Sequence, residues 1–115
     1  MATYIRACWS DCPDGVWGEV NGDSVLLLDG SPIAGARPTG TKKPLAAVTR
    51  YLPPVDAVNV LCIGANYAEH CDESAVARPD HPLLFIKPTT AIAAHGDSIL
   101  LPREAPDEVD YEAEL

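Results

Sequence analysis

The fold of the C-terminal half is decided by residues 58–70, which read Val-Asn-Val-Leu-Cys-Ile-Gly-Ala-Asn-Tyr-Ala-Glu-His. Within this stretch, Val58–Ile63 is apolar at every position except Asn59, which is typical of a buried strand. Gly64 follows directly and is expected to end that strand. The stretch therefore predicts a strand that leads at once into a second element.

A short helix is predicted over Tyr67–Glu73. Asn66 is a residue type that caps helix N-termini, and Glu69 stands three residues later in the reciprocal position of a capping box. His70 and Glu73 are three residues apart, so a helix places them on one face. A carboxylate beside an imidazole raises the basicity of the ring, as an acid–base pair requires, although an exposed helix with an incidental His and Glu has the same spacing.

Three further strands are predicted downstream from their apolar patterns: Leu83–Ile86, Ser98–Leu101 and Val109–Leu115. The last alternates apolar and acidic residues, so Glu112 and Glu114 face one side with Cβ atoms roughly 6 to 7 Å apart. Two carboxylates this close suit a hard divalent cation, and a solvated acidic face has the same pattern. Lys87 follows its strand directly, where it is either a surface charge or a group that meets an anionic substrate.

The N-terminal residues predict a small antiparallel meander of three short strands: Thr3–Ala7, Val16–Val20 and Ser24–Leu28. Between the last two strands, Asn21-Gly22-Asp23 is an Asn-Gly hairpin turn, which takes the positive φ values that such a loop demands. Trp9 and Trp17 are expected to fill the core of the meander, because aromatic residues make up only 6% of the chain.

A connector with local structure is predicted over Asp29–Pro54, which is rich in Gly and Pro. Leu45–Val48 is expected to form one helical or extended turn, and the pair Lys42-Lys43 is expected to be solvated surface. Pro53-Pro54 marks a boundary, since two prolines remove two backbone donors and keep the chain extended. We therefore expect one domain over residues 1–54 and a second over 55–115, in a mixed, β-rich α+β architecture.

The charge balance excludes several classes of partner. Eight Lys and Arg against 17 Asp and Glu give a net charge of −9, so the basic surface that neutralises phosphates is missing. We expect no binding to nucleic acid or to anionic membranes. No stretch approaches the ~20 apolar residues of a membrane span, and the N-terminus lacks a signal-peptide pattern, which together predict a cytoplasmic protein.

The four cysteines are expected to be free thiols, because disulfides are rare in cytoplasmic proteins. A zinc site is the alternative interpretation. Its ligands would be Cys8, Cys12, Cys71 and His70, although no pair among the cysteines has the two-residue gap of a zinc knuckle.

Three ordered motifs together resemble the opening of the fumarylacetoacetate hydrolase family: Val60 to His70, Leu84-Phe85-Ile86-Lys87-Pro88, and Val109 to Leu115. The N-terminal meander is similar to the small domain that many bacterial members carry. The resemblance implies a small N-terminal β domain followed by the start of a catalytic domain of the β-roll type.

The resemblance also implies roles for individual residues. The catalytic pair is His70 and Glu73, the substrate-binding residues are Lys87, Asn66 and Tyr67, and the metal ligands are Glu112 and Glu114. The metal it implies is Mg²⁺ or Mn²⁺, with Ca²⁺ as a further candidate.

Family members act on small 2-oxo or 1,3-dioxo acids, so the resemblance implies metal-dependent hydrolysis of a C–C bond in an acid such as fumarylpyruvate or an acylpyruvate. Two alternatives stay open. One is isomerisation or decarboxylation, of the 2-hydroxyhepta-2,4-diene-1,7-dioate isomerase or oxaloacetate decarboxylase type, and the other is a non-catalytic binding module. The expected partners are the oxo-acid substrate and, at full length, a second copy in a homodimer.

Two departures from the family pattern bear on activity. Ala65 stands where many members have Arg or another larger residue, which leaves the recognition of the substrate carboxylate open. The third metal ligand of the family is an Asp on a later strand, and no such strand precedes Leu115. We therefore expect an N-terminal portion of a family member, with little or no activity as these 115 residues.

Overall fold

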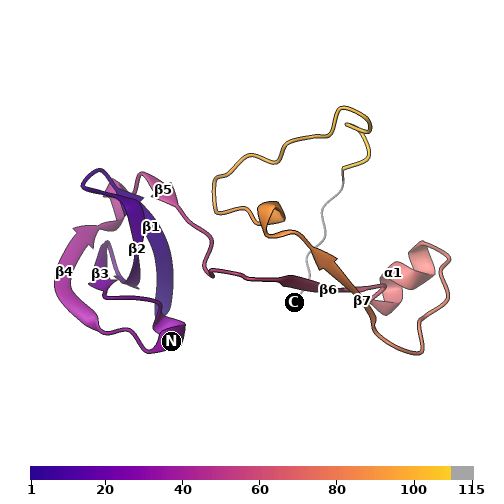
Figure 1. Ribbon diagram of the computed structural model, residues 1–115, viewed down its shortest axis with the longest axis horizontal. Helices are drawn as coiled ribbons and strands as arrows, with labels where there is room; N and C mark the ends of the chain where they lie inside the picture. Colours follow the sequence, from indigo (N-terminus) through magenta and orange to yellow (C-terminus); the bar gives the residue numbers. More distant parts are fainter. Residues whose placement is uncertain (110–115) are drawn as a thin grey trace. The chain divides into compact units, whose positions relative to one another are not determined.

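The computed structural model describes residues 1–109 and divides the chain into two compact units. The first unit consists of Met1–Leu52 and the residues from Ala93 onward, and the second of Pro53–Ile92. Both units are built on antiparallel strands, and the described residues contain one short α-helix (Figure 1). The prediction of a mixed, β-rich architecture is confirmed at this level.

The first unit is a five-stranded antiparallel sheet with the order β4-β3-β2-β1-β5. Its strands are β1 (Thr3–Trp9), β2 (Cys12–Asn21), β3 (Ser24–Leu28), β4 (Pro38–Pro44) and β5 (Arg50–Tyr51). Gly22 takes a φ of +60° between the paired residues Asn21 and Ser24, as the first central residue of a type II′ hairpin turn does. The predicted meander is therefore confirmed, with β1 and β2 longer than expected.

A small apolar core holds this sheet together. It contains the buried residues Ala7, Trp9, Val25 and Leu27, against which Tyr51 and other half-buried side chains pack. The indole Nε1–H of Trp9 donates to the carbonyl of Pro44 at 3.1 Å, so its polar atom is satisfied. Trp17 is also buried, so the structural role predicted for both tryptophans is confirmed.

The predicted connector contains two strands of the sheet. β4 pairs with β3 along one edge, and β5 pairs with β1 along the other. The Leu45–Ala47 segment forms a single 3-10 turn, as expected. The prediction that Lys43 is solvated surface is wrong, because its Nζ donates to both carboxylate oxygens of Asp11, at 2.7 and 2.6 Å.

This ion pair predicts a titration behaviour. The hydrogen bond from Lys43 holds the pKa of Asp11 below its ordinary value, because it stabilises the charged form. The stabilising effect is therefore present above the pKa that Asp11 has in the unfolded chain, and it is lost as the pH falls through the lower folded value. Replacing Lys43 with Ala is expected to raise the pKa of Asp11 toward its ordinary value in an NMR titration.

The control for this titration is the exposed neighbour Lys42, whose replacement by Ala removes the same charge from the chain. Lys42→Ala should leave the pKa of Asp11 nearly unchanged. Equal shifts in both variants would show that net charge, not the Lys43 hydrogen bond, sets the value.

The second unit is a two-stranded antiparallel ribbon with one helix. β6 (Val60–Gly64) pairs with β7 (Leu83–Lys87), and α1 (Ala68–Glu73) follows β6 after a tight turn. A 3-10 turn over Thr89–Ala91 follows β7. The predicted strands and helix of this unit are confirmed, with β6 beginning two residues later than expected.

The strand predicted at Ser98–Leu101 is wrong, since these residues are irregular. Ile99 and Leu100 are among the most exposed apolar side chains, because no strand within residues 1–109 pairs with this segment. The predicted strand Val109–Leu115 lies outside the described residues after Val109, which is irregular and exposed. No helix among residues 1–109 has the length and hydrophobicity needed to cross a bilayer.

Candidate functional site

The helix α1 begins after a strained turn. At the end of β6, Ala65 takes a φ of +50°, in the left-handed region that few residues with a Cβ adopt. The chain then passes through Asn66 to Tyr67, which is extended (φ −106°, ψ 134°) and directly precedes the first helical residue. The capping box predicted for Asn66 and Glu69 is therefore wrong: Tyr67 occupies the N-cap position, and no side chain caps the helix.

Cys71 anchors α1 to this turn. Its side chain is 1% exposed, and its Sγ lies 3.6 Å from the carbonyl oxygen of Ala65, to which the thiol donates. The backbone N–H of Cys71 donates to the carbonyl of Tyr67 at 3.2 Å. The carbonyl of Cys71 in turn accepts from the backbone N–H of Val76 at 2.9 Å. The buried side of the helix is thus fixed by one small residue.

His70 and Glu73 lie on the exposed part of α1. They are three residues apart on a regular helix, so their side chains project from neighbouring positions of one face. Immediately after the helix, Arg78 pairs with Asp72 at 2.7 Å and ties the following loop to the helix. The structure therefore places an imidazole and a carboxylate on the exposed side of one anchored helix, and their pairing for general acid–base chemistry stays a prediction.

Lys87 is placed by the register of the ribbon. It pairs with Val60, whereas Gly64, after which the chain turns toward α1, pairs with Leu83. Four ladder positions separate the two pairs, which corresponds to about 13 Å along the strand. Within the second unit, the ladder therefore sets Lys87 at the end opposite to the turn that carries Asn66 and Tyr67. Its Nζ lies over the ring of Phe85, 5.7 Å from the centroid.

The predicted metal ligands Glu112 and Glu114 lie outside the described residues. Within residues 1–109, no three His, Cys, Asp or Glu side chains gather in an arrangement that could hold a metal ion. Cys8 and Cys12 belong to the first unit and Cys71 and His70 to the second, so the zinc site considered for these four residues stays a prediction. All four cysteines are free, as expected.

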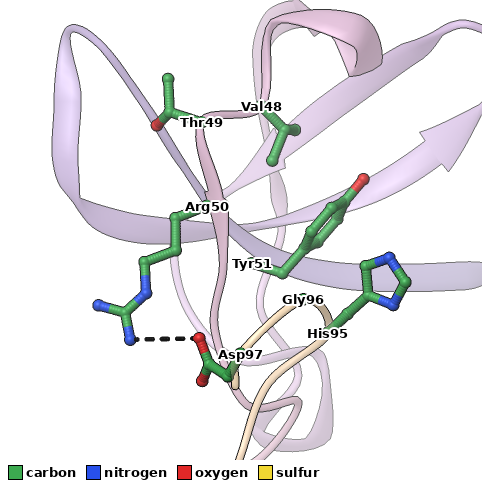
Figure 2. Close-up of a pocket in the computed structure, with 7 residues that line it drawn as sticks. All are labelled: Val48, Thr49, Arg50, Tyr51, His95, Gly96 and Asp97. Atoms are coloured by element: carbon green, nitrogen blue, oxygen red, sulfur yellow. Dashed lines mark ion pairs between the residues drawn. The ribbon is translucent and has the colours of Figure 1, made fainter.

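A pocket that sequence reasoning missed lies in the first unit. It has a volume of about 250 Å³ and is lined by residues 48–51 and 95–97 (Figure 2). The rings of Tyr51 and His95 meet edge to face with centroids 5.3 Å apart, and Arg50 Nη2 lies 3.8 Å from Asp97 Oδ1. Residues 94–97 form a turn on one side of this pocket, which is closed by Asp97 Oδ2 accepting from the backbone N–H of Ala94 at 2.9 Å.

One local signal for this pocket was present in the sequence. His95-Gly96-Asp97 has the composition of a turn, and Gly96 takes a φ of +85°. The packing of this turn against Arg50 and Tyr51 could not be predicted from the local sequence, because it joins residues more than forty positions apart. Arg50 and Asp97 carry opposite charges and offset each other, so the pocket has no clear preference for an anion or a cation.

Comparisons with known proteins agree on the family. Residues 59–115 match the family described as fumarylacetoacetate (FAA) hydrolase C-terminal, and residues 14–54 match the family described as Rv2993c-like, N-terminal. A protein of Archaeoglobus fulgidus is 43% identical over 97 residues, which cover 84% of this chain and 34% of that protein.

Two further proteins extend the comparison. The rat protein named oxaloacetate tautomerase Fahd2a, mitochondrial, is 42% identical over 72 residues, or 63% of this chain and 23% of its own length. A solved structure of an uncharacterized protein from Mycobacterium abscessus superimposes with a TM-score of 0.58 at 32% identity, covering 76% of this chain and 33% of that one.

The chain spans about a third or less of each of these proteins. Its motifs, the two family matches and the relatives agree with one another across both halves of the sequence. The chain belongs to the fumarylacetoacetate hydrolase family.

Proposed function

We propose that this chain is part of a metal-dependent enzyme that forms and protonates the enol or enolate of a small 2-oxo acid. The observation that carries the proposal is α1, which presents His70 and Glu73 together within the segment that matches the catalytic family. Keto–enol interconversion needs one group that moves a proton and one that stabilises negative charge on oxygen. His70 is assigned the proton transfer, and Glu73 orients its ring.

Oxaloacetate tautomerisation is the first candidate reaction, because a relative that is 42% identical carries the name oxaloacetate tautomerase. Hydrolysis of a C–C bond in an acylpyruvate or fumarylpyruvate is the second candidate. Both reactions share the enolate, since cleavage of the C–C bond leaves its electrons on the same oxo-acid carbon. They differ in that hydrolysis also needs a positioned water, which the same His70–Glu73 pair is suited to activate.

Glu112 and Glu114 are proposed to hold Mg²⁺ or Mn²⁺, with Ca²⁺ as a further candidate. The donor set fits such an ion, because carboxylate oxygens are the ligands that hard divalent cations prefer. When bound, the ion supplies positive charge that stabilises the enolate oxygen. Asn66 and Tyr67, next to the left-handed Ala65, are proposed to contact the substrate, and Lys87 to meet its carboxylate once the rest of the catalytic domain is present.

The same proposal includes a division of the chain into two domains. Residues 1–54 are assigned to a small N-terminal β domain and residues 55–115 to the start of the catalytic domain. The full-length protein is proposed to be a cytoplasmic homodimer.

A chimera tests the proposed reaction. In it, this chain replaces the matching third of the Archaeoglobus fulgidus relative, to which it is 43% identical. We expect the chimera to catalyse enol–keto conversion of oxaloacetate in the presence of Mg²⁺, and the 115-residue chain alone to be inactive. Removing the metal with EDTA, or replacing Glu112 and Glu114 with Gln, is expected to abolish the activity.

Three outcomes distinguish the candidates. Conversion of oxaloacetate without loss of carbon supports the tautomerase. Release of pyruvate and a second acid from an acylpyruvate supports the hydrolase. A folded chimera that binds Mg²⁺ but turns over neither compound would refute the enzymatic proposal and favour a binding module.

A further inference from the structure

The helix α1 lies between two alanines that adopt a left-handed backbone conformation. Ala65 precedes the helix with a φ of +50°, and Ala75 follows it with a φ of +51°. This conformation brings the Cβ of an L-residue too close to a carbonyl oxygen, so residues other than glycine adopt it rarely. They keep it only where the surrounding structure holds them there. Each of the two alanines therefore needs a structural reason for its conformation.

The conformation of Ala75 is explained by the way α1 ends. The backbone N–H of Val76 donates to the carbonyl of Cys71 at 2.9 Å. The backbone N–H of Ala75 donates to the carbonyl of Asp72 at 3.3 Å. These two bonds, with a left-handed residue directly after the C-cap Ser74, form the Schellman motif that ends many helices. Ala75 therefore serves the helix end itself.

The conformation of Ala65 has a different origin. This residue lies two positions before the N-cap Tyr67, and the start of a helix needs no left-handed residue. The carbonyl oxygen of Ala65 accepts from the thiol of Cys71, whose Sγ lies 3.6 Å away. Cys71 is 1% exposed, so this contact comes from the buried side of the helix. The structure thus supplies one specific contact at the strained residue.

The turn at Ala65 sets the direction of the chain that follows it. Gly64, the last residue of β6, is fixed by its place in the ladder with β7. A change in the φ of Ala65 rotates the following residues relative to this strand. A return to a negative φ would therefore swing the Ala65 carbonyl away from the thiol. The same rotation would displace Asn66 and Tyr67.

We propose that Ala65 and Cys71 form a positioning element, in which the thiol holds the left-handed turn in place. The turn in its turn fixes Asn66 and Tyr67 relative to His70. This inference rests on the proposed function, which gives those three residues their roles. Ala65 leaves the left-handed region once its holding contact is lost, whereas glycine takes a positive φ about as readily as a negative one. The thiol is therefore needed only while residue 65 carries a Cβ.

Second-site rescue in the chimera tests this dependence. Cys71→Ala removes the thiol and is expected to lower kcat/KM roughly 10- to 100-fold, because a displacement of about 1 Å in a site can cost about 100-fold. Adding Ala65→Gly is expected to recover most of the loss, since glycine needs no holding contact. Ala75→Gly is the matched control, because it removes the same group at nearly the same φ on the other side of α1. It is expected to recover none of the loss.

A serine variant separates the hydrogen bond from packing. Cys71→Ser keeps a donor at the same position, whereas Cys71→Ala keeps the position apolar. If the thiol only fills space, alanine is tolerated better, because burying a hydroxyl costs free energy unless it is hydrogen-bonded. If the thiol holds the Ala65 carbonyl, serine retains more of kcat/KM than alanine. We expect the second order.

Hydrogen exchange in the 115-residue chain gives a readout that needs no activity. The backbone N–H of residue 71 donates to the carbonyl of Tyr67 at 3.2 Å, so its protection reports opening of the turn. Cys71→Ala is expected to lower this protection roughly 2- to 10-fold, which corresponds to the loss of one hydrogen bond. Ala65→Gly is expected to restore it, whereas Ala75→Gly acts mainly on the N–H of Val76.

Three results would overturn the inference. Cys71→Ala with the kcat/KM and protection of the parent would show that the thiol does not hold the turn. Failure of Ala65→Gly to recover the loss would show that strain at this residue is not the cause. Equal recovery by Ala75→Gly would show that any stabilisation of α1 suffices. An inactive chimera would instead refute the proposed function, and the protection of the residue 71 N–H then decides the inference alone.

Discussion

Replacing His70 with Gln in the active chimera is expected to lower kcat roughly 100- to 10,000-fold, the range that loss of a general acid–base group produces. Gln has a similar length and hydrogen-bonds like a neutral imidazole, but it cannot accept and release the proton. His70 is exposed on α1, so we expect the substitution to change the thermal stability little. The loss should therefore appear in kcat at constant thermal stability.

His81 provides the matched control. It is an exposed histidine of the same unit, in the loop that precedes β7, and His81→Gln removes an imidazole without touching α1. We expect kcat of the His81 variant within about twofold of the parent. If His70→Gln retains full kcat while Glu112→Gln abolishes it, proton transfer belongs to another residue of the full-length enzyme.

Replacing Trp9 with Ala is expected to remove most of the stability of the first unit. Trp9 is 3% exposed and packs in the core with Val25, and its indole N–H is bonded to Pro44. Truncation of a buried Trp to Ala costs about 3–5 kcal/mol in the free energy of unfolding. A unit of this size has a total stability of roughly 3–8 kcal/mol, so the loss is comparable with the whole.

Urea unfolding measures this effect, with Trp17 remaining as the fluorescent probe. The expected result is a collapse of the unfolding midpoint toward zero denaturant. Tyr4→Ala is the control, since Tyr4 lies on the same strand but is 43% exposed, and its midpoint should shift little. An unchanged midpoint for Trp9→Ala would show that the indole does not support the sheet.

Local patterns predicted the central strands of the first unit but not its edges. Ser24–Leu28 has a hairpin signal on one side and a continuous apolar run, and it forms β3 with those bounds. β4 was missed because its sequence, Pro-Thr-Gly-Thr-Lys-Lys-Pro, has the composition of a loop. Two prolines, a glycine and two lysines are tolerated at the edge of a sheet, where one side of the backbone needs no partner.

The opposite error occurred at Ser98–Leu101. Its apolar residues satisfy the pattern of a strand, but a strand forms only where a neighbour offers hydrogen bonds, and no described segment does so. An apolar pattern therefore indicates which residues could form a strand, but it does not show whether a partner strand is available.

The candidate site was predictable only where it is local. The spacing of His70 and Glu73 determines that a helix presents them together, and α1 does so. The N-cap was predicted wrongly, because the left-handed conformation of Ala65 has no signature in an alanine. The position of Lys87 opposite Val60 follows from strand register, which depends on pairing across more than twenty residues of chain.

The connectivity of the first sheet also has a consequence for the order in which it folds. Strands β1 to β4 are each paired with the strand next to them in the chain, so they can assemble by successive hairpins as synthesis proceeds. β5 is different, because Cys8 pairs with Arg50, 42 residues later. Closing a loop of that length costs about 3 kcal/mol of chain entropy, which the preformed hairpins reduce. We therefore expect β5 to dock last, so that the five-stranded sheet is complete once Tyr51 has left the ribosome and before the ribbon of the second unit has been made.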